Sequence, residues 1–241
     1  MEAFAATAPM MAGLLPRGDG GTVLVLPGFM AADGSTKPLR ALLGTLGYEA
    51  HGWGLGRNIG PTGEIVEGLV ALVDRLRCDN GPIHVVGWSL GGMFARELAR
   101  LDPDAVHQVI TLGSLFQTIG PEQSNAAAAF RALQHRHTDT IMAPHVPSWA
   151  RDRCPMPTTS IYTKGDGIVN WHQCLNRKLP YAENVEVYGS HCGLGHNPAA
   201  MFVIADRLAT PTDDWRPFRA PLPLKALYPH AVDFDTASSA A

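Results

Sequence analysis

Residues 87–91 read Gly-Trp-Ser-Leu-Gly and match the pattern G-x-S-x-G. A serine hydroxyl becomes a nucleophile for acyl groups when a positioned base takes its proton. The short pattern gains weight from its setting, because the apolar run Ile-His-Val-Val precedes it and a helical segment follows directly. A strand, a sharp turn and a helix expose such a serine at the end of a sheet, with helix N–H groups nearby. We therefore predict Ser89 as a nucleophile; the alternative is a serine that only caps the helix.

Side chains at Gly87 and Gly91 would clash in a turn of this kind, because neighbouring backbone passes close to it. The turn must be held by regular elements on both sides. Apolar runs predict strands at 22–26, 48–53, 83–86, 106–112, 158–163 and 185–188, and helical periodicity predicts helices at 38–46, 64–76, 90–101 and 198–208. Asn197 and Pro198 are typical of a helix start.

This alternation predicts the α/β class: a mostly parallel sheet of about six strands, flanked by helices. We expect the 241 residues to form a single domain. Two segments leave the alternation. Residues 114–157 are rich in Ala, His and Pro and are either a small cap or lid insertion or a structural excursion without a role in binding. Residues 211–241 are expected to be a tail on the surface.

Composition narrows the possible partners. The formal net charge is −3 with no long run of one sign, which argues against a nucleic-acid surface. The sequence has no run of 18 apolar residues, so it predicts no membrane-spanning helix. The N-terminus has no positive region typical of a secretory signal. We therefore expect a cytoplasmic protein. The four cysteines form no C-x-x-C pair, and a disulfide between Cys174 and Cys192 stays open.

Five short motifs, LPGF, HGWGLGRN, GWSLGG, DGIV and GSHCGLGHNP, carry a resemblance to the α/β-hydrolase superfamily, in particular to small bacterial esterase- and lipase-like serine hydrolases. The resemblance covers residues 22–208. It implies the α/β-hydrolase fold and a serine, acid and histidine in that order along the chain. The family usually has His-Gly where this chain has Pro27-Gly28, which implies that Phe29 gives one oxyanion N–H. Leu90, after the nucleophile, would give the other.

The acid should follow a late strand. Asp166 lies in such a loop, within the DGIV motif, whereas its rivals Asp139 and Asp152 lie in the insertion. The base should follow the last strand, where His191 comes first and His196 is the alternative. The pattern in related lipases favours His191. Its partner Asp166 would hold the imidazole tautomer and stabilise the imidazolium.

Other candidates weigh less. Trp53, Arg57 and Asn58 of HGWGLGRN could line the site, or that loop could be a glycine-rich turn packed on the serine turn. No cofactor is expected, because Gly52, Gly54 and Gly56 lack the strand–helix unit of a dinucleotide site. No metal is expected either, although His135, His137 and His145 stand in the insertion.

We therefore predict a serine hydrolase that cleaves a small-molecule ester or lipid through an acyl-serine intermediate. Two other hypotheses remain open. An acyltransferase or thioesterase could use the same triad with another acceptor or leaving group. A non-catalytic binding module on a hydrolase scaffold is the third, since a fold does not guarantee an activity. The acyl chain length, the leaving group and the number of subunits are not specified by these motifs.

Overall fold

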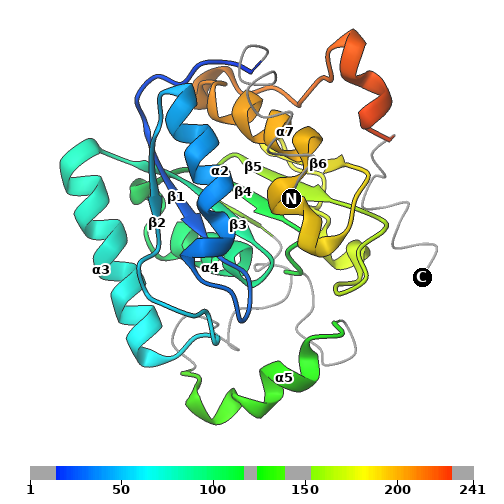
Figure 1. Cartoon of the computed structure of the whole chain (residues 1–241). Helices are drawn as coiled ribbons and strands as arrows, with labels where there is room; N and C mark the ends of the chain where they lie inside the picture. Colours follow the sequence, from blue (N-terminus) through cyan, green and yellow to red (C-terminus); the bar gives the residue numbers. More distant parts are fainter. Residues whose placement is uncertain (1–14, 117–123, 139–152, 230–241) are drawn as a thin grey trace.

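The computed structural model describes residues 15–116, 124–138 and 153–229 (Figure 1). A six-stranded sheet in the order β2-β1-β3-β4-β5-β6 forms its centre, and every neighbouring pair is parallel. The strands are β1 (Thr22–Leu26), β2 (Glu49–Gly52), β3 (Ile83–Trp88), β4 (Val106–Leu112), β5 (Thr158–Tyr162) and β6 (Ala182–Glu186). The predicted parallel α/β sheet of about six strands is thus confirmed.

Helices cover both faces of the sheet, as the alternation of buried side chains requires. Successive residues of β1 point to opposite faces: Val23 and Val25 pack with α2 (Asp33–Leu46) and α7 (Pro198–Leu208), while Leu24 and Leu26 pack with α3 (Gly63–Asn80) and α4 (Leu90–Leu101). Figure 1 shows α2 and α7 together on the near face of the sheet. Because all five residues of β1 are buried, this strand reads as a continuous apolar run.

Shorter helices fill the connections: α5 (Ala127–Ala132) and the 3₁₀ turns η1 (Pro103–Ala105), η3 (Gln134–Arg136), η4 (Trp171–Cys174), η5 (His191–His196), η6 (Thr212–Asp214) and η7 (Leu222–Leu227). The predicted start of α7 is confirmed, since the side chain of Asn197 accepts hydrogen bonds from the N–H groups of Ala199 and Ala200. Among the described residues, no helix combines the length and the apolar character needed to cross a membrane.

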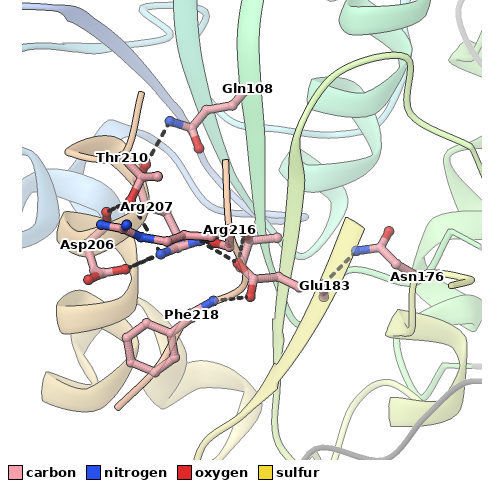
Figure 2. Close-up of polar contacts among 9 residues, drawn as sticks. Gln108, Asn176, Glu183, Asp206, Arg207, Thr210, Arg216 and Phe218 are labelled. Atoms are coloured by element: carbon pink, nitrogen blue, oxygen red, sulfur yellow. Dashed lines mark hydrogen bonds and ion pairs between the residues drawn. The ribbon is translucent and has the colours of Figure 1, made fainter. Parts of the chain in front are cut away.

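Several predicted boundaries were wrong. Helix α3 ends at Asn80, four residues beyond its predicted end. The last strand spans 182–186, not 185–188, because it pairs with β5 from Ala182 to Glu186. The side chain of its polar residue Glu183 contacts Arg207 and Phe218, which are far along the chain (Figure 2). Helix α2 begins at Asp33, five residues before the predicted start at Pro38. The carboxylate of Asp33 accepts hydrogen bonds from the N–H groups of Trp53 and Gly54, both at 2.9 Å. These contacts anchor the helix start, and no local pattern reveals them.

Buried polar contacts tie the segment after α7 to the edge strand β6 (Figure 2). Arg207 of α7 lies 3.3 Å from Glu183 of β6, and their side chains are only 3% and 8% exposed. Glu183 also accepts a hydrogen bond from the N–H of Phe218 at 2.7 Å, and Arg207 donates to the carbonyl of Arg216. Burial raises the pKa of the Glu183 carboxyl. The described part of the predicted tail therefore docks on the fold.

Candidate active site

Ser89 lies in a sharp turn between β3 and α4. Its φ of 53° is in the left-handed region, which costs a serine conformational energy. Surrounding backbone maintains the conformation: the N–H of Ser89 donates to the carbonyl of Leu112 at 2.8 Å. A Cβ on Gly87 would come within 2.4 Å of Gly91 backbone, and one on Gly91 within 2.5 Å of a carbonyl of β1, so the predicted clashes are confirmed. The setting is the strand–turn–helix that the motif predicts.

Asp166 and His191 form a short hydrogen bond, with 2.6 Å between Oδ2 and Nδ1. Their side chains are 1% and 7% exposed. Asp166 follows β5, and its other oxygen accepts the N–H groups of Ile168 and Val169 at 2.9 and 2.8 Å. The carboxylate is fixed in orientation, because His191 binds one oxygen and these two N–H groups bind the other. Nδ1 of His191 is occupied by this contact, which leaves Nε2 for proton exchange.

The serine turn and the acid–base pair meet at the carboxyl edge of the sheet. The indole N–H of Trp88 donates to the carbonyl of His191 at 3.1 Å, so the residue before Ser89 holds the backbone of the histidine loop. Gly113, at the end of β4, lies against the pair: a Cβ there would be 3.1 Å from both Asp166 Oδ2 and His191 Nδ1. The structure thus gathers the three predicted residues at one edge of the sheet.

The two predicted oxyanion residues belong to the two segments that meet at the serine turn. Leu90 is the first residue of α4, where backbone N–H groups have no partner within the helix. Phe29 follows Gly28 in the loop after β1, and a Cβ on Gly28 would be 3.2 Å from Ser89 Cβ. The oxyanion role of these two backbone N–H groups stays a prediction.

The alternative base, His196, occupies a different position. Its ring packs edge-on against Trp88, with 5.7 Å between ring centroids, and burial lowers its pKa. The hydrogen bond to Asp166 belongs to His191. The rival acids Asp139 and Asp152 lie outside the described residues.

Residues 124–138, within the predicted insertion, bridge two loops of the site edge. At one end, Asn125 N–H donates to the carbonyl of Ile168, beside the acid, at 2.8 Å. At the other end, His137 Nε2 lies 2.8 Å from the carbonyl of Ile59. Between them, Phe130 of α5 packs on Phe29, with ring centroids 5.5 Å apart. The segment therefore brings an apolar side chain onto a residue next to the serine.

Trp53 and Asn58, two of the residues that could line the site, make contacts within the fold. The ring N–H of Trp53 donates to Gly56 at 3.0 Å within a buried cluster, and Asn58 is fully buried with its side chain on Pro27. The HGWGLGRN loop thus packs on the loop after β1, the loop that carries Phe29. Cys174 is a buried free thiol, and Cys192 is an exposed one. Burial raises the pKa of Cys174.

Sequence reasoning missed Trp88 and Gly113. Trp88 stands at a variable position of G-x-S-x-G, so the motif does not predict that its indole reaches the loop of His191.

Of the three histidines in the insertion, His135 is exposed, His137 contacts Ile59 and His145 lies outside the described residues. Within the described part of the chain, no three His, Cys, Asp or Glu side chains converge as metal ligands would.

Comparisons with known proteins concern the fold. The family model for the alpha/beta hydrolase fold matches residues 61–150. Similar solved structures include lipase B of Aspergillus fumigatus, with 18% identity, a TM-score of 0.63 and coverage of 81% of this chain and 55% of the lipase chain. The chain therefore has the fold of the α/β hydrolases. A comparison with curated protein sequences gave no match.

Two further structures cover nearly the same share of this chain. One is described with LipS and LipT, two metagenome-derived lipolytic enzymes: identity is 16%, the TM-score 0.60, and the coverage 80% of this chain and 93% of that one. The other is MGS-MChE2, an alpha/beta hydrolase enzyme from a sediment metagenome of the Mar Chica lagoon, Morocco, with 18% identity, a TM-score of 0.54 and coverage of 79% and 90%. At these identities the likeness concerns the fold.

Proposed function

We propose that the protein is a serine hydrolase that cleaves carboxylic esters through an acyl-Ser89 intermediate. The observation that carries the proposal is the buried 2.6 Å bond between Asp166 and His191, at the sheet edge where the β3–α4 turn presents Ser89. A serine becomes reactive only beside an oriented base. The lipolytic names of similar structures agree with an ester substrate.

The reaction would run in two halves. Ser89 Oγ attacks the ester carbonyl carbon while His191 Nε2 takes its proton, and the N–H groups of Phe29 and Leu90 stabilise the tetrahedral oxyanion. Asp166 holds the imidazole by Nδ1 and stabilises the imidazolium. His191 then protonates the departing alcohol, which leaves the acyl-enzyme. Water then attacks the acyl carbonyl while His191 takes its proton. His191 gives this proton to Ser89 Oγ as the acid leaves, which restores the free enzyme.

The ring pair Phe29–Phe130 supports an apolar acyl group. Both side chains are half-buried at the edge of the apolar cluster that includes Leu90. An acyl chain that replaced water on these rings would gain about 25 cal/mol per Å² of apolar surface buried. We propose that the segment 124–138 covers the acyl chain of the substrate. A panel of p-nitrophenyl esters of graded acyl length tests the preference.

The decisive experiment is Ser89→Ala. We expect it to abolish p-nitrophenyl ester turnover and covalent labelling by a fluorophosphonate probe, while circular dichroism shows a folded protein. Ser35→Ala is the matched control, because Ser35 Oγ donates to the backbone carbonyl of Ala32, just before α2. Activity retained in Ser89→Ala would contradict the proposal. Failure of the probe to label the wild type would favour a binding module, and preferential acyl transfer to an added alcohol or thiol would favour a transferase.

A further inference from the structure

Asn58, in the loop after β2, is fully buried and uses all four of its polar groups. Its side-chain Nδ2 donates to the carbonyl of Pro27 at 2.8 Å, and its Oδ1 accepts the N–H of Gly60 at 3.2 Å. Its backbone carbonyl accepts the N–H of Met30 at 2.7 Å, and its backbone N–H donates to the carbonyl of Ala31 at 2.8 Å. The partners fix the amide orientation, because one is a carbonyl and the other an N–H.

Three of these four contacts fall on residues 27–31, the segment that carries Phe29. This segment is irregular: Met30 has a φ of 61°, a left-handed conformation that a methionine rarely adopts. The carbonyl of Pro27 lies against the start of α4, since a Cβ on Gly91 would come within 2.7 Å of it. The Asn58 amide therefore holds the segment at its first residue, next to the serine turn.

We propose that Asn58 is a positioning residue for the oxyanion donor at Phe29, acting through its amide bond to Pro27. This inference rests on the proposed function. The donor is a backbone N–H, so its direction depends on the peptide planes of residues 27–30 and not on the Phe29 side chain. A donor shifted by about 1 Å from the oxyanion loses much of its effect, and such misplacement can cost on the order of 10²-fold in rate.

The bond also explains why an amide stands at this position. A carboxylate of the same shape could accept from Gly60, but its second oxygen would face the carbonyl of Pro27, and two acceptors repel. An apolar side chain would leave both backbone groups buried without a partner. Only a side chain with one donor and one acceptor on the same short stem satisfies both.

Asn58→Asp tests the inference, with Asn58→Ser as a second variant that removes the amide without adding charge. The matched control is Asn184→Asp in the edge strand β6. The Asn184 amide likewise bonds one backbone N–H and one backbone carbonyl, those of Asn176, at 2.7 and 2.9 Å. Wild type, Ser89→Ala and the three variants are assayed on a p-nitrophenyl ester at a temperature below the unfolding transition of each.

We expect the Asn58 variants to lower kcat about 10- to 100-fold with KM changed by less than about threefold, since an oxyanion hole acts on the transition state. They should also bind a trifluoromethyl ketone, which forms an oxyanion on the enzyme, correspondingly less tightly. Asn184→Asp should lose stability but keep kcat.

Three results would overturn the inference. Asn58 variants with the kcat of Asn184→Asp would refute it while leaving the proposed function standing. Unfolded Asn58 variants beside a folded Asn184→Asp would show that Asn58 serves the fold as a whole. A wild type without ester turnover would overturn the proposed function and this inference with it.

Discussion

The ring N–H of Trp88 donates to the backbone carbonyl of His191 over 3.1 Å, in a buried position. The residue before the candidate nucleophile thereby holds the loop of the candidate base, although 103 residues separate them in the chain. The indole also contacts the same loop further on, because a Cβ on Gly195 would come within 2.5 Å of its ring.

Trp88→Phe should therefore lower kcat/KM more than its effect on stability explains. The phenyl ring keeps most of the packing, but the carbonyl of His191 loses its donor, which costs about 1–3 kcal/mol of stability. Ester kinetics and urea unfolding measure the two effects. Trp53→Phe is the control, since Trp53 donates in the same way to Gly56. Equal kcat/KM in the two variants would contradict a role for Trp88 in positioning His191.

Asp166→Asn should abolish most activity and leave the fold intact. Asparagine keeps an oxygen for the N–H groups of Ile168 and Val169. Its NH₂ group, however, would donate to Nδ1 of His191 and hold the wrong tautomer, which lowers kcat on the order of 10³- to 10⁴-fold in triads of this kind. Steady-state kinetics and the thermal unfolding midpoint test both parts. A loss below about tenfold would argue that another acid serves His191.

Gly113→Ala should impair both stability and activity. The residue has a φ of 53°, and an added Cβ would lie 2.8 Å from Leu194 and 3.1 Å from the Asp166–His191 pair. We expect a loss of at least about 1 kcal/mol of stability and a clear fall in kcat. Gly20→Ala is the control, because Gly20 also has a positive φ but no atom within 4 Å of the added Cβ. If both variants kept wild-type kcat, Gly113 would not shape the site.

Protonation of His84 should destabilise the fold. Burial lowers its pKa from 6.5 to about 4, helped by the neighbouring His107 and opposed by Asp19. Gln108 Nε2 lies 3.1 Å from its Nδ1, which suits the neutral ring. Because the folded-state pKa is the lower one, the stability that neutral His84 preserves is present above pH 6.5 and is lost as the pH falls toward 4.

His84→Asn isolates this effect, since asparagine can accept the same hydrogen bond and gains no proton. The wild type should lose about 2–3 kcal/mol of unfolding free energy relative to the variant between pH 7.5 and pH 4.5. Urea unfolding at several pH values measures the difference. A difference that does not change with pH would show that His84 is not held neutral in the folded protein.

Local pattern predicted much of this molecule. The order of the six strands along the chain, the four long helices and the turn that exposes Ser89 follow from apolar periodicity and glycine spacing within about a dozen residues. Asn197 as a helix cap belongs to the same class, because its partners are two and three residues away. Asp166 and His191 were predicted because each lies in a loop after a predicted strand and in a motif that resembles related lipases.

Only the tertiary structure decided which groups meet. The start of α2 depends on Asp33 reaching Trp53, and the bounds of β6 on its pairing with β5. Trp88 reaches His191, and Asn58 reaches Pro27, through contacts between segments that no short pattern links. The physical reason is separation along the chain. A buried hydrogen bond between distant residues forms only where the sheet brings their two segments side by side. The sequence by itself predicted a nucleophile at Ser89, and the packed fold decided what holds the predicted partners of Ser89 in place.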